Sequence, residues 1–520
     1  LRLYFFTIRY LTFIQVFYRI YYLLRTRARK IISFSYPKRI VPVGIQLKLE
    51  KSLSAAPSVK YQKGTFTFLN LEQTYSSSID WNDSTHGKLW TYNLNYFEFL
   101  HTPTISKNEG INLILNFIDN IDQSKDGLEP YPISLRVIHW VKFLVFHEVK
   151  NKTINESLYH QLWTLADQRE YHILGNHLLE NGFGLLFGAY YFNDNDLYQL
   201  AKKILEPELN EQILKDGAHF ELSPMYHQLM LYRVLDCYNL VLHNSGFDQE
   251  LLLLFKDKAQ IMLGWLEQMS FEDGAIPLFN DSALGINPST KELTRYANRL
   301  GIQSIKKPLK ESGYRKVHFP AYECIVDIGQ IGPDYLPGHA HSDTFNFALH
   351  AKGKSFIVDT GTSTYNPTER RQLERGTAAH NTVQIDEQEQ SEIWGSFRVA
   401  RRAYPKIIQD KPHLIEAELN YSTSKNLTHH RFFSFAPNEI IIYDNIRAKE
   451  QGKAYIHFHP SVTPRIEGNC VHTHLGEIKI RGAEKIALSN YEYASGFNNL
   501  TSSQKLVVFF NKNLTTTISF

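Results

Sequence analysis

Residues 337–386 decide the fold of the chain, and they read PGHAHSDTFNFALHAKGKSFIVDTGTSTYNPTERRQLERGTAAHNTVQID. Phe345, Phe347 and Leu349 alternate with polar or small residues, which is the period-two pattern of a half-buried strand. The dipeptide at 352–353, Lys-Gly, predicts a tight turn, and residues 355–358 predict a short return strand. The stretch therefore predicts a β-hairpin, and the alternation over 382–386 predicts another strand after it.

Candidate metal ligands lie at the ends of these strands. A hairpin places the start of its first strand and the end of its second at the same end of the sheet, so we expect His341 and Asp359 near one edge. The register requires the segment before Asp359 to fold back by several residues. His380 stands at the entry of the next strand. Two imidazoles and a carboxylate are typical of zinc sites with three protein ligands. The alternative is three unrelated polar residues at strand ends.

Length and composition indicate a globular protein of two or three domains. The chain has 520 residues, 43% hydrophobic and 21% charged, which is too long for one ordinary core. Aromatic residues reach 13%, which suits large cores and also sugar-stacking clefts. A net charge of +3 and the absence of a recognition motif argue against a nucleic-acid partner. Three widely spaced cysteines exclude a disulfide scaffold.

The hydrophobic patterning divides the chain into three parts. Residues 1–80 predict a partly helical N-terminal extension. Residues 81–312 show the 3.6-residue period of consecutive helices with short polar loops, which predicts antiparallel helix pairs in an array or toroid. Residues 313–520 show many short alternating strands, which predicts a large β-sandwich.

The first 30 residues are apolar, aromatic and basic. Arg9 and Arg19 interrupt the apolar run, so it lacks the roughly 18 uncharged residues of a membrane-spanning helix. No small-residue cleavage site indicates a secretory signal. The pattern favours an ordinary helix packed on the main body, and a peripheral membrane-surface helix is the alternative.

Two places in the helical half carry more polar chemistry than packing needs. Asn176 and Glu180 share a face at a helix entry beside His177, although Asn176 as a cap and a solvated His177 would explain them equally well. Ser223 followed by proline marks a helix start and places Tyr226 in the first turn. The helix dipole there favours anions, so we expect a lowered pKa for the Tyr226 phenol, with a buried, satisfied hydroxyl as the alternative. A weaker cluster, residues 129–136, adds Arg136 as a carboxylate binder or a structural ion-pair partner.

These motifs together resemble the heparinase II/III-like polysaccharide lyases, including their alginate-cleaving relatives. The match runs over residues 85–460 in order, and its pieces are Asn176-His177, Ser223-Pro224-Met225-Tyr226, Gly338-His339-Ala340-His341-Ser342-Asp343, Val358-Asp359-Thr360-Gly361-Thr362 with Tyr365, and Arg375-Gly376-Thr377-Ala378-Ala379-His380-Asn381-Thr382-Val383. The resemblance implies an incomplete (α/α) toroid followed by an antiparallel β-sandwich, with an active-site cleft between them. It also implies a location in the cell envelope or periplasm, although without a recognisable signal peptide the cytoplasm stays open.

The resemblance implies eliminative cleavage of an acidic polysaccharide at a uronic acid, and it assigns roles to individual residues. Asn176 would hydrogen-bond the uronate carboxyl group with His177 beside it, Tyr226 would transfer the proton, and His339 would neutralise the carboxylate or act as base. Tyr365 matches a second tyrosine of the alginate-cleaving branch. The zinc ligands would be His341, Asp359 and His380, with the ion supporting the loop that bears His339.

The residue types fit this chemistry independently. Elimination removes a proton α to a carboxylate, so the site needs hydrogen-bond donors for the carboxylate, a base and an acid. Glu180, Arg136 and Arg375 are further candidates for substrate binding, with structural roles as the alternative. Two other functions remain open at this point, a zinc-dependent polysaccharide hydrolase or deacetylase and a non-catalytic or modifying protein of polysaccharide biosynthesis.

Overall fold

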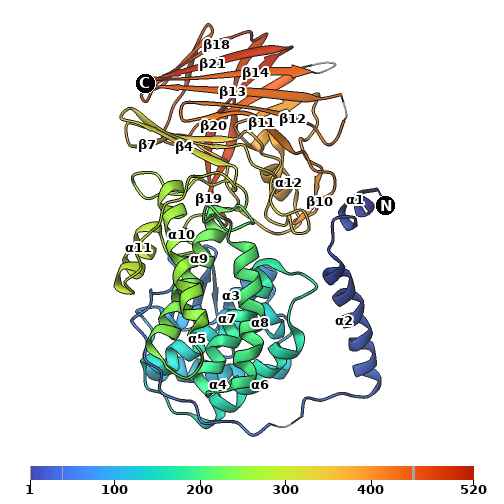
Figure 1. Ribbon diagram of the computed structural model, residues 1–520, viewed down its shortest axis with the longest axis vertical. Coiled ribbons are helices and arrows are strands. Elements are labelled where there is room, and N and C mark those ends of the chain that lie inside the picture. The colour runs from blue at the N-terminus through green and yellow to red at the C-terminus, as the bar shows by residue number, and fades with distance from the viewer. Residues whose placement is uncertain (1, 38, 425, 448–450) are drawn as a thin grey trace.

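The computed structural model describes residues 2–37, 39–424, 426–447 and 451–520. The chain forms a helical body and a strand-rich body, one above the other in Figure 1. Two N-terminal helices run along one side of the helical body and reach the level of the strand-rich body. The predicted order of an α half followed by a β half is therefore observed.

The N-terminal extension packs on both bodies. It comprises α1 (Arg2–Ile8), α2 (Phe13–Ile31) and a small sheet of β1 (Lys60–Gln62), β2 (Thr65–Phe68) and β3 (Leu71–Thr74). The amide of Gln15 donates to the carbonyls of Ile173, at 3.0 Å, and Tyr335, at 3.3 Å. The indole of Trp394 donates to Thr7 at 3.0 Å, which ties α1 to the strand-rich body. Packing on the main body is thus confirmed. Among the described residues, no helix combines the length and apolar character needed to cross a bilayer.

The helical body consists of consecutive helices that pack against their neighbours in the chain. Their N-termini carry the expected caps, with Ser106, Asn151, Asp194, Ser223 and Ser289 each accepting from a backbone N–H of the first turn. The helices are α3 (Lys88–Tyr96), α4 (Lys107–Asp119), α5 (Pro130–Phe146), α6 (Lys152–Gln168), α7 (Gly175–Phe192), α8 (Asn195–Gln212), α9 (Pro224–His243), α10 (Glu250–Met269) and α11 (Thr290–Arg299). Because α5, α7 and α9 are buried on nearly every side, they form the centre of this body.

The strand-rich body is a sandwich in which an eight-stranded antiparallel sheet faces two four-stranded sheets across one apolar core. In spatial order the large sheet holds β11 (Pro405–Lys411), β12 (Leu414–Asn420), β13 (Thr428–Ala436), β14 (Glu439–Arg447), β21 (Asn513–Ser519), β18 (Glu477–Arg481), β17 (Cys470–His472) and β16 (Arg465–Glu467). The smaller sheets hold β19 (Lys485–Gly496), β20 (Asn499–Phe510), β15 (Gly452–His457) and β8 (Val383–Ile385), and β4 (Tyr314–Phe319), β5 (Tyr322–Asp327), β6 (Phe347–Ala351) and β7 (Lys354–Ile357). A two-stranded ribbon, β9 (Ile393–Trp394) with β10 (Arg398–Val399), follows the helix α12 (Glu369–Arg375).

The predicted hairpin is β6–β7. Its turn places Lys352 at φ +52° and Gly353 at φ +70°, as the favoured two-residue hairpin turn requires. Register shifts by one residue within the pair, and the chain then leaves the sheet at Asp359. The residues that precede β6 and follow β7 therefore lie on the side of the sandwich that faces the helical body.

Candidate active site

The first part of the site lies at the start of α7, where Asn176 is buried in the first turn. Its side-chain Nδ2 donates to Glu221 Oε1 at 2.9 Å and Oε2 at 3.0 Å, and its backbone N–H donates to Oε1 at 3.1 Å. Glu221 is fully buried, and its Oε2 lies 3.4 Å from His339 Nε2 of the β-sandwich. A carboxylate of the protein thus sits between the two groups that the sequence predicts to bind the substrate carboxylate.

Tyr226, His339 and Tyr365 meet where the two bodies touch. The rings of Tyr226 and His339 stack with centroids 3.8 Å apart, so one sugar ring can contact both. The Tyr365 hydroxyl donates to the Tyr226 oxygen at 3.3 Å. Burial raises the pKa of Tyr226 well above its usual value, and Tyr365 raises it further. The expected lowering of this pKa by the helix start is therefore wrong for the unliganded protein, because desolvation outweighs the dipole. The Tyr226 phenol is therefore held in its neutral form.

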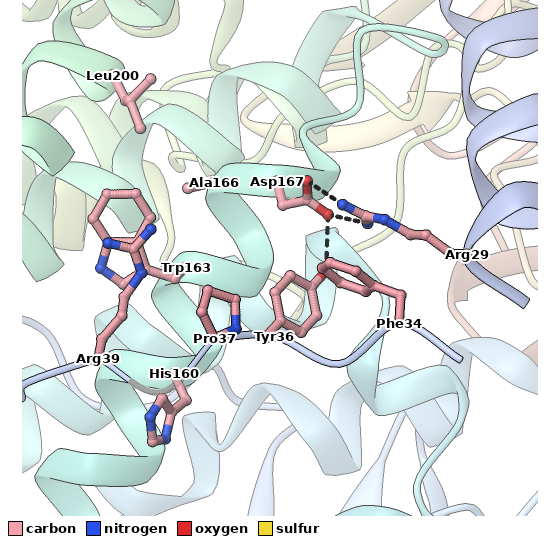
Figure 2. A pocket seen from close by; sticks show the side chains of 10 residues that line it. All are labelled: Arg29, Phe34, Tyr36, Pro37, Arg39, His160, Trp163, Ala166, Asp167 and Leu200. Atoms are coloured by element: carbon pink, nitrogen blue, oxygen red, sulfur yellow. Dashed lines mark hydrogen bonds and ion pairs between the residues drawn. The ribbon is translucent and has the colours of Figure 1, made fainter. Parts of the chain in front are cut away.

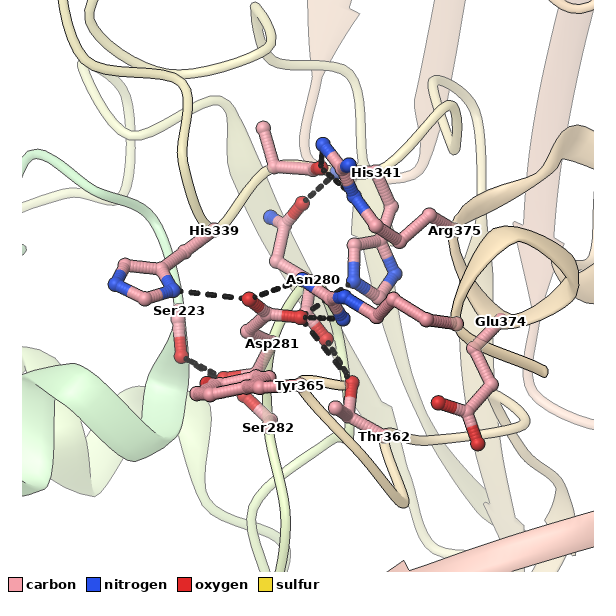
Figure 3. Close-up of polar contacts among 12 residues, drawn as sticks. Ser223, Asn280, Asp281, Ser282, His339, His341, Thr362, Tyr365, Glu374 and Arg375 are labelled. Carbon is pink, nitrogen blue, oxygen red and sulfur yellow. Dashed lines mark hydrogen bonds and ion pairs between the residues drawn. The ribbon is translucent and has the colours of Figure 1, made fainter. Parts of the chain in front are cut away.

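Asp281 joins the two bodies beneath His339 (Figure 3). Its Oδ2 lies 2.9 Å from His339 Nδ1, its Oδ1 lies 2.9 Å from His341 Nε2, and both oxygens accept from the guanidinium of Arg371. Asp281, His341 and Arg371 are fully buried. Although burial alone would raise the pKa of Asp281, Arg371 and the two histidines hold it well below its usual range. An ionised carboxylate therefore fixes His339 with Nδ1 as the protonated nitrogen and leaves Nε2 toward Glu221.

His177 is the partly exposed cation of the site. Its Nδ1 lies 2.9 Å from Glu170 Oε1, and its ring packs on Tyr131 at 4.5 Å between centroids. Burial works against a charge here, but Glu170 outweighs it and raises the pKa of His177 above its usual value. The Nε2 side of an imidazolium is thus offered to a ligand next to Asn176.

Two of the predicted substrate-binding residues are buried and contact other parts of the protein. Arg136 is fully buried and donates from Nε to Gln161, and from its two Nη atoms to the carbonyls of Asn95 and Gly127. Glu180 is fully buried and accepts from Arg233 at 3.2 Å through Oε1, while its Oε2 has no hydrogen-bond partner among the described residues. Burial of both side chains argues against the predicted contact with a substrate.

Arg375 is likewise buried and braces the loop that carries the histidines. Its Nε and Nη2 donate to the Ala340 carbonyl at 3.2 and 3.0 Å, and Nη1 donates to Gly395 at 2.9 Å. The residue that it holds, Ala340, lies between His339 and His341. Arg375 therefore positions the site instead of binding the substrate.

A second polar cluster of Asp343, Asp359 and His380 lies in the sandwich. One ligand atom from each lies within 4.8 Å of the others, and all three residues are buried. His380 Nδ1 lies 2.8 Å from Asp359 Oδ2. Burial alone would lower the pKa of His380, but Asp359 outweighs it and raises that pKa. Within the described residues His380 Nε2 and Asp343 Oδ2 have no hydrogen-bond partner. This donor set fits a metal ion, because buried, unpaired nitrogen and carboxylate oxygen are what such an ion uses.

The cluster differs from the predicted ligand set by one residue. Asp359 and His380 come together as expected, but Asp343 joins them where we expected His341. His341 directs Nε2 to Asp281, its ring centroid lies 5.3 Å from that of His380, and its Nδ1 has no partner among the described residues. Burial lowers the pKa of His341 to about 4, so the ring is neutral at pH 7.

Sequence reasoning missed Glu170, Glu221, Asp281 and Arg371. Asp281 had a signal, since it stands in the polar run Asn-Asp-Ser between apolar segments, and Glu221 stands two residues before the cap Ser223. Arg371 lies in a helix that reads as an ordinary charged surface segment. No local sequence pattern marks Glu170 as a residue of the site.

Together, a helical body and an antiparallel sandwich that share one Asn–Tyr–His site define the toroid-plus-sandwich class of carbohydrate-active proteins. The chain belongs to the heparinase II/III-like family. Residues 130–301 match the family's "Heparinase II/III N-terminus" model, and residues 303–520 match its "Heparinase II/III-like, C-terminal" model.

Relatives agree with this assignment. A heparin-sulfate lyase of Bacteroides stercoris is 23% identical over 316 residues, which are 55% of this chain and 46% of the relative. A heparin-sulfate lyase of Pedobacter heparinus is 27% identical over 245 residues, 41% of this chain and 36% of the relative. The chain thus matches less than half the length of these curated relatives. A crystal structure of heparinase III superposes with a TM-score of 0.65 at 17% identity, covering 86% of this chain and 80% of that one. The predicted incomplete (α/α) toroid followed by a β-sandwich is confirmed.

Proposed function

We propose that the protein is a polysaccharide lyase that cleaves a uronate-containing polysaccharide by β-elimination. The observation that carries the proposal is the stacking of Tyr226 from the helical body on His339 from the sandwich, with Asn176 and His177 beside them. Elimination needs an acid, a base and a carboxylate site within the length of one sugar ring, and these residues supply all three.

The carboxylate of the uronate would bind between Asn176 and His177. An ionised carboxylate acidifies the neighbouring C5 proton poorly, so donors that compensate its charge lower the barrier. His177 offers an imidazolium whose charge Glu170 stabilises. The Asn176 amide carries two hydrogens, so it can donate one to the substrate carboxylate and the other to Glu221.

Proton transfer divides between His339 and Tyr226. Asp281 orients His339 through Nδ1, so Nε2, which lies 3.4 Å from Glu221 Oε2, is the nitrogen placed to take the C5 proton. Tyr226, which burial keeps neutral, is suited to protonate the departing O4 oxygen. The Tyr365 hydroxyl, 3.3 Å from the Tyr226 oxygen, helps to keep the phenol protonated before the transfer. Each positioned transfer contributes roughly 100- to 10,000-fold.

We propose zinc as the ion for the cluster of Asp343, Asp359 and His380. Zinc would supply positive charge beside these buried carboxyl groups, since burial raises the pKa of Asp343 to about 6 and of the neighbouring Asp327 well above its usual value. All three side chains are buried, so they hold the strand ends beside His341 and His339 instead of facing a substrate. This burial disfavours the alternative of a zinc-dependent hydrolase, which needs an open coordination position for water.

Incubation with uronate polymers tests the proposal. The panel should include heparan sulfate, because both curated relatives are named heparin-sulfate lyases, together with chondroitin sulfate and alginate. A lyase leaves a conjugated C4–C5 double bond that absorbs in the near ultraviolet. Loss of the signal in Tyr226→Phe and His339→Ala, with both variants folded, supports the mechanism. Activity that both variants retain in full refutes it, and no product from any polymer favours the non-catalytic alternative.

We propose in addition that α2 rests on an anionic membrane surface, which would place the protein at the cell envelope. Phe13, Phe17, Ile20 and Leu24 follow one outward face of α2 and are 82, 50, 54 and 57% exposed. The first acidic residue of the chain is Glu50, so the whole region is basic. Amphipathic basic helices with aromatic residues bind such surfaces. Flotation with phosphatidylglycerol vesicles should recover the protein, and Phe13→Ser with Phe17→Ser should abolish recovery. Equal recovery of the double variant excludes this contact.

A further inference from the structure

Two adjoining cavities lie between the C-terminal end of α2 and the helical body, with volumes of about 310 and 650 Å³. Both are lined by Arg29, Phe34 and Tyr36, so we treat them as one feature, the α2 groove. Figure 2 shows the first cavity, with the chain after α2 passing over the side chains of α6. The volumes fall within or near the range of about 300–1,000 Å³ that is usual for ligand sites.

The α2 groove carries an excess of positive charge. Asp167 is the acidic residue among its linings, and it already accepts from Arg25, Arg29 and Tyr36. Burial would raise the pKa of Asp167, but Arg29 and Tyr36 outweigh it and lower that pKa, so the carboxylate is ionised and fully engaged.

Two further cations line the groove without such a partner. Within the described part of the chain neither Lys30 nor Arg39 forms an ion pair with a carboxylate. The guanidinium of Arg39 lies 3.5 Å from the ring centre of Trp163. Free ammonium and guanidinium groups bind carboxylates and sulfates, and a guanidinium held on an aromatic ring is already ordered for that task.

Aromatic rings accompany these cations. Phe34 and Tyr36 pack edge to face at 5.2 Å and are 38 and 39% exposed, and Trp163 lies on the opposite wall. The guanidinium groups lie on these rings, Arg39 on Trp163 and Arg29 on Phe34 at 4.1 Å, so the groove presents ordered cations beside apolar ring edges, which suits the acid groups and C–H surface of an anionic sugar. An inorganic anion would use the charges alone.

The groove lies beside segments that hold residues of the active site. Its lining includes Pro130 and His172, and the residue after Pro130, Tyr131, packs on His177. His172 lies between Glu170 and the start of α7. A polysaccharide chain that extends from His177 toward α2 would reach the groove. The helix itself lies outside residues 130–301 and 303–520, which match the family models, whereas the opposite wall of the groove lies within them.

We propose that the α2 groove is an outer subsite that holds a carboxylate- or sulfate-bearing unit of the polysaccharide whose cleavage takes place at Tyr226 and His339. The inference rests on the proposed lyase function and adds to it a preference for long anionic chains. The sugar unit at the cleavage position is bound only by the site of Asn176, His177, Tyr226 and His339. Units further along the polysaccharide are bound by Lys30 and Arg39.

The test compares Lys30→Gln/Arg39→Gln with a matched control, Arg27→Gln/Lys48→Gln. The control also removes two exposed cations of the N-terminal segment, and neither of its positions lines the groove. Affinity electrophoresis through gels that contain each polymer measures binding without catalysis. Initial rates on long chains and on tetrasaccharides of the same polymer then give KM and kcat.

We expect the groove variant to bind long chains roughly three- to tenfold more weakly than wild type, the loss of two partly exposed ionic contacts. Its KM for long chains rises by the same factor, while kcat and the KM for tetrasaccharides stay unchanged. The control should match wild type. The proposal is overturned if the two double variants lose polymer binding equally. It is also overturned if KM rises equally for long and short substrates.

The electrophoresis separates this proposal from the lyase function. If no polymer yields unsaturated product, the lyase function fails, and retention in the gel still reports whether Lys30 and Arg39 bind an anionic chain. If the groove variant loses binding to phosphatidylglycerol vesicles and keeps full binding to every polymer, a lipid headgroup is the ligand and the subsite is refuted.

Discussion

Replacing Asp281 by asparagine removes one charge and keeps the shape of the side chain. In the structure this carboxylate accepts from both Nη atoms of Arg371 and lies 2.9 Å from nitrogens of His339 and His341, and Asp281, Arg371 and His341 are fully buried. The neutral amide of the D281N variant would leave a buried guanidinium uncompensated, which costs about 3–5 kcal/mol of folding free energy. We expect this loss of folding free energy at neutral pH. The low pKa of Asp281 means that its contribution is lost only as the pH falls through that value, so wild type and variant should converge in acid.

Chemical denaturation of D281N, Arg371→Gln and the double variant measures this coupling. Each single change leaves one buried charge alone, whereas the double change removes both, so the double variant should be less destabilised than the sum of the two by about 2–3 kcal/mol. D281N should also lose activity, because His339 loses the acceptor that fixes its tautomer. A loss below about 1 kcal/mol in D281N, or strict additivity in the double variant, would contradict the role given to Asp281.

Four further outcomes are expected. Glu170→Gln should lower the pKa of His177, so the loss of activity with rising pH should occur at lower pH than in wild type, and an unchanged pH profile would refute the imidazolium role. Tyr226→Phe should lower kcat roughly 100- to 10,000-fold with little change in KM, and a KM effect alone would assign it to binding. Asp343→Asn should lower the zinc content found by elemental analysis, and a full equivalent of zinc in this variant would remove Asp343 from the ligand set. Arg136→Met should lower the thermal unfolding midpoint and leave KM unchanged, and a raised KM would restore it as a substrate-binding residue.

Local patterns predicted the elements of the fold because each carries its own signal. The alternation around Phe347 and the Lys352-Gly353 turn give the hairpin, and Ser223 followed by proline gives the start of α9. These are short-range effects of strand pleating and capping, which the sequence displays directly. The arrangement of the two bodies came from the order of the motifs and from their resemblance to a known family.

The chemistry of individual groups depended on contacts that sequence does not display. Glu221 meets Asn176 across 45 residues, and Asp281 meets Arg371 across 90. Burial also decides function, since a buried Arg136 serves the protein itself and a buried Tyr226 keeps its proton. Both facts are set by packing between distant segments, so the sequence left a binding and a structural role open for Arg136 and pointed to the wrong pKa shift for Tyr226.

The measurement that tests the central claim most directly is cleavage of a uronate polymer, followed by mass analysis and ultraviolet absorption of the products. An elimination that uses Tyr226 and His339 adds no water, so each cleavage leaves one unsaturated end that is lighter by one water than the hydrolysis product and absorbs in the near ultraviolet. Tyr226→Phe should abolish these products. Products that are all saturated, with the mass of one water added at each cleavage, would show hydrolysis and contradict the account.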